Sequence, residues 1–425
     1  MKVFNELGEL VETNWRKRDY LEDEFPEIAA HALAEIDLAK AGVSPWEIIR
    51  WLHAEPQLTR QQDIEGSFGN PPITLYNGPR FYIDIYFWLD GTTDIHQHGF
   101  AGAFQVLAGS SIHSKYSFLE KQVINEHFRI GDVVFESVEL LTERAVRKIV
   151  PGGKHIHSLF HLDRPSATIT VRTFAVPSAQ PQYSYRKPSI AIDPFFKEPS
   201  LIKKLQTAAM LLDLQAPTYD EIVGDLIRNS DFHTTFLLLE LANRRLSGSQ
   251  LEQVLNVATS RTRFEQLLGQ ARRKHGELID CLLSVLEEQN RIENIVRRRQ
   301  FITTPEHRFF LALLLNVPSR AKLLELVKER FPEKDPVDTV LDWVMDLSST
   351  RVWGSSEPNV LGLTDFNDDY LFVLECLLKN TSAAQMKDSI ERQYPADYAR
   401  KLESRVGGII ESLRKSVLFK SILAE

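Results

Sequence analysis

The chain has 425 residues, of which 43% are hydrophobic and 25% are charged, proportions that exclude a mainly disordered or collagen-like protein. Its 50 Lys and Arg residues against 58 Asp and Glu residues give a net charge of −8, which argues against a broad nucleic-acid-binding surface. The two cysteines, Cys281 and Cys376, are too few for a disulfide framework or a thiolate metal site, and they suit a reducing compartment.

The opening stretch MKVFNELGELVETNWRKRDY carries charges where a signal peptide needs an apolar core. The longest apolar runs, such as FFLALLLNV, reach about half of the ~20 residues that a membrane span requires. We therefore expect a cytoplasmic protein without membrane contact.

The N-terminal residues 1–63 favour helices. PEIAAHALAEIDLAKAG (26–42) consists mostly of helix formers between a start and a stop signal. In SPWEIIRWLHAE, Ser44 is the expected N-cap of a helix that begins at Pro45.

Residues 64–180 carry short β runs separated by Gly, Pro, Asn and Asp. The clearest run is FYIDIYFW (81–88), in which apolar side chains alternate with Tyr, Asp and Trp. Residues 195–425 return to helical spacing, and the proline-rich stretch 180–199 is predicted to be a linker. The fold class is therefore α+β and multidomain: short helices, a small β-barrel and a large all-α domain.

The first candidate for chemistry is His96-x-His98, which closely follows the strand predicted at 81–88. Two residues that are two positions apart on a strand point to the same face, with Cα atoms about 6–7 Å apart. Two such imidazoles suit one divalent metal, among them Fe, Ni, Cu or Zn. Two exposed histidines on a surface strand would give the same pattern.

A second histidine group lies in PGGKHIHSLFH, with His155, His157 and His161 just before another predicted strand. His155 and His157 share a strand face. One of the two could supply a third ligand from the opposite side of the barrel, which would leave open coordination positions for substrate and oxygen or water.

Together these motifs resemble the two-motif signature of the cupin superfamily, whose members are small double-stranded β-helix barrels with a metal inside. The first motif reads G(x)4HxH with Gly109 eleven residues on, and the second reads PGGxHxH. The usual Glu ligand after H-x-H is missing, because the chain has Gly-Phe-Ala-Gly-Ala there. The sequence is therefore most similar to the cysteine-dioxygenase-like thiol dioxygenases, over residues 70–176, and Trp88 and VLAG (106–109) match as well.

The resemblance implies Fe(II) held by His96, His98 and His157, with Ni, Mn or Zn as alternative metals. His157 fits the spacing to the last strand better than His155, which stays the second choice. The implied partners are O2 and a small-molecule or carrier-bound substrate, and cupins commonly pair as homodimers.

Two departures separate the chain from cysteine dioxygenases. The substrate-pairing Arg upstream of the first motif has no counterpart in GNPPITLYNG (69–78), and Ala103 replaces the Cys that many members crosslink to a Tyr. The metal site carries over, and cysteine as the substrate does not.

Three further side chains are candidates for substrate contacts: Arg172, Tyr86 and Gln105. A guanidinium in the barrel mouth could clamp a carboxylate or phosphate; alternatively the Arg172 stem packs while its head reaches solvent or Asp84. Tyr86 and Gln105, for which we expect an inward orientation, could donate hydrogen bonds to substrate or could simply satisfy a core network.

Three hypotheses for the function follow. The leading one is a non-haem Fe(II)-dependent dioxygenase that acts on an unidentified, thiol-containing or carried substrate, with the helical half as a lid or docking site. The alternative is a non-catalytic metal- or ligand-binding cupin with a helical interaction domain. A metal-free structural barrel is the third, and burying several imidazoles without a partner would make it costly.

Overall fold

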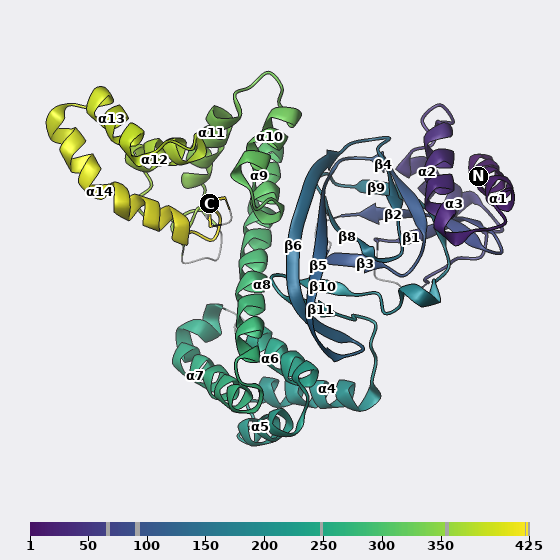
Figure 1. The fold of residues 1–425 in the computed structure, drawn as a ribbon, viewed down its shortest axis with the longest axis horizontal. Helices are drawn as coiled ribbons and strands as arrows, with labels where there is room; N and C mark the ends of the chain where they lie inside the picture. The colour runs from purple at the N-terminus through teal and green to yellow at the C-terminus, as the bar shows by residue number, and fades with distance from the viewer. Residues whose placement is uncertain (65–68, 90–93, 247–249, 353–356, 421, 424–425) are drawn as a thin grey trace.

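The fold is α+β, with β-strands that follow three short N-terminal helices and precede a long run of helices (Figure 1). The computed structural model describes residues 1–64, 69–89, 94–246, 250–352, 357–420 and 422–423, with 250–261 described for their backbone only. The N-terminal elements are α1 (Lys2–Arg16), the 3-10 turn η1 (Glu22–Glu24), α2 (Phe25–Glu35) and α3 (Pro45–Ala54).

The α3 helix begins as predicted, because the Ser44 side chain accepts a hydrogen bond from the Glu47 backbone N–H at 3.2 Å. The helix expected over 26–42 is shorter: α2 ends at Glu35, since Ile36 is extended and the chain then turns. Both helices pack with α1 against one face of a β-sheet.

That sheet has five antiparallel strands, in the order β1 (Pro72–Asn77), β2 (Phe81–Trp88), β9 (Ser166–Thr173), β4 (Gly102–Ala108) and β7 (Val146–Ile149). The alternation predicted for β2 is confirmed. Its odd-numbered side chains enter the core under the N-terminal helices, with Phe81 5.7 Å from Phe25 between ring centroids. Its even-numbered side chains, Tyr86 and Trp88 among them, therefore face the other way, toward the second set of strands.

The second set is a closed barrel of six strands. Their order around the ring is β10 (Ser184–Arg186), β11 (Ile190–Ile192), β6 (Phe128–Leu141), β5 (Ser111–Asn125), β8 (Gly152–His161) and β3 (Ile95–His98). The ring closes where β10 pairs with β3, through Ser184 opposite His96.

The linker predicted over 180–199 is therefore wrong for residues 184–192. After the 3-10 turn η2 (Pro177–Ala179), the chain forms β10 and β11, and the backbone turns back between them. These two strands are the last members of the closed barrel, so the barrel extends to Ile192 and the helices begin at Pro199.

The C-terminal part is helical. Its helices are α4 (Pro199–Asp213), α5 (Tyr219–Asn229), α6 (Phe232–Leu246), α7 (Gln250–His275), α8 (Leu278–Phe301), α9 (Pro305–Asn316), α10 (Arg320–Arg330), α11 (Pro336–Ser348), α12 (Asp368–Leu378), α13 (Ala383–Gln393) and α14 (Ala396–Lys415). Within the described ranges, none of them combines the length and the apolar character that a membrane crossing needs.

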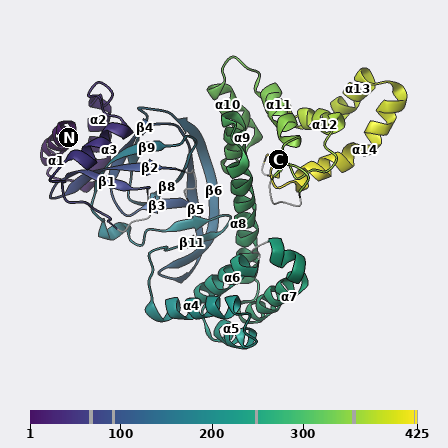
Figure 2. The same ribbon diagram turned by 180° about the vertical axis from the view of Figure 1, so that it is seen from behind.

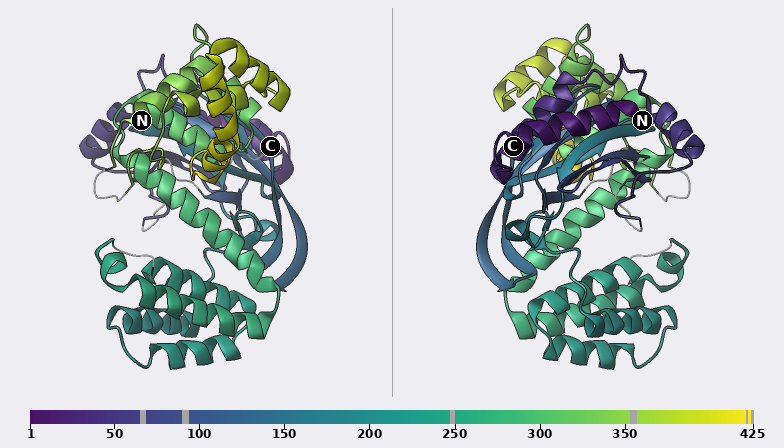
Figure 3. Two further views of the ribbon diagram at one scale, coloured as in Figure 1. Left: turned by 90° about the vertical axis from the view of Figure 1, so that its left-hand side faces the viewer. Right: turned by 90° about the vertical axis from the view of Figure 1, so that its right-hand side faces the viewer.

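The helices pack on the outer side of the closed strands. The long helix α8 runs beside β5 and β6 and connects the α4–α7 group to α9–α14 (Figures 1 and 2). Figure 3 shows the α4–α7 group, in teal, set apart at one end of the molecule. Ile112 and Phe160 of β5 and β8 join the core of α9–α12, while Phe128 and Ile190 of β6 and β11 join that of α4–α8.

Candidate metal centre

Three histidines from neighbouring strands of the barrel meet on the side that faces the five-stranded sheet. His96 and His98 lie on β3, and His157 lies on β8 directly opposite His96 in the strand register. All three are buried, and one ring nitrogen from each lies within 4.8 Å of the others. The structure thus brings together the three residues that the sequence predicted as ligands, and it places His157 rather than His155 in this group.

The protonation of these imidazoles suits metal binding. Burial lowers the pKa of His96 and lowers those of His98 and His157 well below the usual range, so all three are neutral at pH 7. His96 Nδ1 lies 2.8 Å from the Asp94 carbonyl oxygen. A carbonyl can only accept, so Nδ1 carries the proton and Nε2 carries the lone pair. Neutral imidazole is the form that binds Fe, Ni, Cu or Zn.

His157 also belongs to a second group, with His113 of β5 and His155 of β8. His157 Nε2 lies 2.8 Å from His98 Nε2, and its Nδ1 lies 2.9 Å from His113 Nε2. His155 Nε2 is buried with no hydrogen-bond partner among the described residues. The two groups therefore share one imidazole, which faces one set of histidines through each of its nitrogens.

A cavity of about 40 Å³ adjoins the first group, between the two sets of strands. One water molecule needs ~10–15 Å³ of such space, so the cavity has room for a few water-sized groups. Its walls combine the three histidines with aromatic, hydroxyl and guanidinium side chains: Tyr86, Trp88, Phe100, Phe104, Ile149, Leu159, Thr168, Thr170 and Arg172.

Arg172 and Tyr86 both line this cavity and contact each other. Arg172 Nη1 donates to the Tyr86 hydroxyl at 3.3 Å, and that hydroxyl donates to Asp84 Oδ2 at 3.2 Å. The guanidinium stacks on Phe100, 3.4 Å from the ring centroid. Burial raises the pKa of Asp84 to about 6. Both alternatives considered for Arg172 thus have support in the structure. Its guanidinium is linked to Asp84 through Tyr86, and it also lines the cavity beside the histidines.

Gln105 does not reach the cavity, which corrects the orientation expected from the sequence. Its side chain donates to the backbone oxygen of Leu33 in α2 at 3.0 Å. On β4 the even-numbered Phe104 faces the cavity, so its odd-numbered neighbour points to the opposite face. Gln105 is therefore part of the contact between the sheet and the N-terminal helices.

The sequence reasoning also missed His113, whose ring nitrogen comes within 2.9 Å of His157. The only indication in the sequence was a single histidine in the run SSIHSKYSF (110–118), within the β-rich residues 64–180. Its partners are 44 and 26 residues away, at His157 and Glu139, so the strand register was needed to find them.

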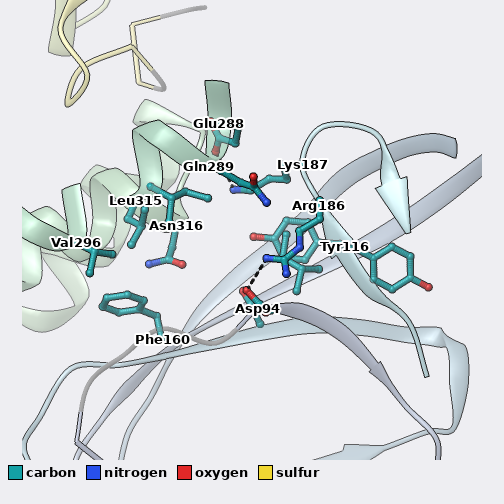
Figure 4. A pocket seen from close by; sticks show the side chains of 14 residues that line it. Asp94, Tyr116, Phe160, Arg186, Lys187, Glu288, Gln289, Val296, Leu315 and Asn316 are labelled. Carbon is teal, nitrogen blue, oxygen red and sulfur yellow. Dashed lines mark hydrogen bonds and ion pairs between the residues drawn. The ribbon is translucent and has the colours of Figure 1, made fainter. Parts of the chain in front are cut away.

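A separate cavity of about 110 Å³ lies on the outer side of the closed strands, against α8 and α9 (Figure 4). Asp94 and Arg186 form an ion pair of 3.3 Å at its edge, and Phe160, Val296 and Leu315 supply apolar wall. Asp94 lines this cavity and also contacts the histidine group, through its carbonyl oxygen and His96 Nδ1.

The fold and the site together define a small closed β-barrel with a three-histidine group, consistent with a cupin-like metal site. No family model and no curated protein matches the chain. Among the solved structures that match part of it are the following two. The TT1209 protein of Thermus thermophilus is 19% identical, covers 27% of this chain and 90% of its own, and has a TM-score of 0.17. The BH2720 protein of Bacillus halodurans is 13% identical. The match covers 29% of this chain and 86% of BH2720, with a TM-score of 0.18.

The buried histidines predict how the stability of the metal-free protein depends on pH. Burial lowers the pKa of His155 to about 4 and that of His161 to about 3, whereas an unfolded histidine titrates near 6.5. Below pH ~6.5 the unfolded chain therefore binds more protons than the folded protein. The free energy of unfolding then decreases as the pH is lowered, by up to about 1.4 kcal/mol per pH unit for each such histidine.

The measurement is the thermal midpoint of chelator-treated protein at pH 7 and pH 5. We expect the midpoint to be lower at pH 5, and we expect His161→Asn to make the drop smaller. A midpoint that is unchanged or higher at pH 5 would show that the histidines are not buried in neutral form.

Proposed function

We propose that the protein is a metal-dependent oxygenase that binds Fe(II) through His96, His98 and His157. The observation that supports the metal site is the convergence of three buried, neutral imidazoles within 4.8 Å beside a cavity. Three histidine ligands would leave coordination positions open, as in non-haem iron sites that bind both substrate and oxygen. The likeness of the motifs to three-histidine thiol dioxygenases supports the choice of iron.

When bound there, Fe(II) would supply the activation of O2. The residues of the chain supply binding and exclusion of water. Arg172 has a buried Nε with no hydrogen-bond partner among the described residues, so it keeps a donor for an anionic group of the substrate. The Tyr86 hydroxyl lies 3.3 Å from Arg172 Nη1 and keeps the guanidinium at the cavity. Phe100, Phe104 and Trp88 provide apolar walls.

The substrate class that this wall fits is a small anionic molecule or the end of a carried group. The guanidinium recognises a carboxylate or phosphate, and the aromatic walls accept a short apolar or sulfur-containing portion. A cavity of about 40 Å³ has room for only a few water-sized groups, so the substrate would enter by its reactive end or after side chains move.

The alternative is a metal- or ligand-binding barrel without turnover, whose helices are the interaction surface. One observation favours it: α8 and α9 line the outer cavity that contains Asp94, the residue whose carbonyl holds His96. A ligand or partner at these helices could therefore alter the metal site.

Metal analysis and oxygen uptake test the two proposals. Full-length protein purified without a histidine tag is analysed for metal, loaded with Fe(II) without oxygen, and mixed with aerated thiols and short carboxylates. We expect about one iron per chain and oxygen consumption with at least one compound. Stoichiometric zinc or nickel without oxygen uptake would favour the alternative, and a protein that binds no metal in any state would contradict both.

A further inference from the structure

We infer that His113 is a positioning residue for the metal centre, since it fixes His157 in the tautomer whose Nε2 lone pair points at His96 and His98. It follows that the two histidine groups that share His157 form one metal centre and not two. This inference rests on the proposed metal site, and it concerns residues that contact a ligand without being ligands themselves.

The contacts form one continuous series across five strands. Arg147 of β7 donates to both carboxylate oxygens of Glu139 on β6, through Nε at 2.8 Å and through Nη2. Glu139 Oε1 lies 2.8 Å from His113 Nδ1, and His113 Nε2 lies 2.9 Å from His157 Nδ1. His157 Nε2 then lies 2.8 Å from His98 Nε2.

The donors and acceptors along this hydrogen-bonded series determine which nitrogen of each histidine carries the proton. Glu139 is an ionised carboxylate because its hydrogen bonds from Arg147 hold its pKa far below the usual range, so it can only accept. His113 Nδ1 therefore carries a proton and donates it. Burial lowers the pKa of His113 and so favours its neutral form. A neutral His113 that is protonated on Nδ1 has a bare Nε2, which has to accept from His157 Nδ1–H. A neutral His157 is left with its lone pair on Nε2.

The same count argues against a second metal ion. Binding at His113, His155 and His157 would need lone pairs on both nitrogens of the 2.9 Å contact. The proton between them occupies that place, and Glu139 prevents His113 from turning its proton toward His157 instead. His113 thus acts on His157 as a carboxylate or carbonyl acts on many metal-bound histidines, and the Asp94 carbonyl does the same for His96.

The tautomer is testable without metal. Full-length, metal-free protein labelled with 15N in histidine is studied by NMR through the couplings between ring nitrogens and ring protons. His157→Ala identifies the His157 signals by their absence. We expect His157 with Nδ1 protonated and Nε2 bare, and we expect this preference to be lost in His113→Phe, whose ring cannot accept the proton. A wild-type His157 protonated on Nε2 would overturn the inference.

Titration of the metal-free protein with Co2+, followed by visible absorption, tests the consequence for binding. Wild type is expected to bind one ion per chain, and His113→Phe is expected to bind it about 10–100-fold more weakly, the usual effect of losing such a partner. His113→Gln is the matched variant, because its amide oxygen can accept from His157 Nδ1, and it should recover most of the affinity.

The possible outcomes distinguish the role of His113 from the existence of the metal site. Two ions per chain in the wild type, or unchanged affinity in His113→Phe, would overturn the role of His113 while the metal site stands. A wild type that binds no Co2+ would overturn the metal site itself and this inference with it.

Discussion

Replacing His96 with alanine is expected to empty the metal site and leave the fold nearly intact. The variant removes one of three ligand nitrogens that lie within 4.8 Å of one another. The loss of affinity should exceed the ~100-fold that follows the loss of a supporting hydrogen bond alone. Metal per chain after dialysis is the measurement, and circular dichroism with a thermal melt checks the fold.

His161→Asn is the matched control for that variant. His161 is also a buried barrel histidine, stacked on Trp88 with ring centroids 4.5 Å apart and 2.9 Å from the Ser111 hydroxyl. It belongs to neither histidine group found among the described residues, so its variant should keep the metal. Full occupancy in His96→Ala would sink the assignment, and equal loss in both variants would point to general damage of the barrel.

Phe81→Ala is expected to have the largest effect on stability, about 3–5 kcal/mol. The Phe81 ring is fully buried between the N-terminal helices and the sheet, with ring centroids 5.7 Å from Phe25, 6.4 Å from Trp15 and 5.5 Å from Tyr76. The cavity left by the ring cannot close without moving both layers. Urea denaturation is the measurement, read at the first transition because a chain of this size need not unfold in one step.

The control for Phe81→Ala is Phe195→Ala, at a ring that is 64% exposed. That variant should change stability by no more than about 0.5 kcal/mol. Because Phe81 points away from the histidines, its variant should still bind metal below the urea midpoint. A loss of less than 1 kcal/mol in Phe81→Ala would contradict the packing of the helices on the sheet.

The sequence predicted those parts of the fold and site that depend on local periodicity. The alternation of 81–88 gave the bounds of β2 and both of its faces correctly, because one face is buried under helices and the other faces the barrel. The spacing of His96 and His98 placed two imidazoles together for the same reason. The Ser44 cap was visible because the hydrogen bond it makes spans three residues.

What the sequence could not give depends on contacts between distant segments. The strands β10 and β11 have three residues each, too few for any period, and the prolines around them suggested a linker. Gln105 was oriented wrongly because the chain turns between β3 and β4, so parity could not be counted from one strand to the next. His113 meets Glu139 and His157 only because of the register of β5 with β6 and β8.

The closure of the ring by β10 determines where the chain can be truncated. A fragment cut after residue 180, where the barrel was predicted to end, would lack the strand that pairs with β3. The backbone beside His96 would become an open sheet edge, which invites pairing with other chains and aggregation. A fragment that ends after Ile192 keeps the ring, but it exposes Phe128 and Ile190, which α4–α8 cover in the intact chain. The helices therefore cover apolar side chains of the barrel that would otherwise be exposed to water.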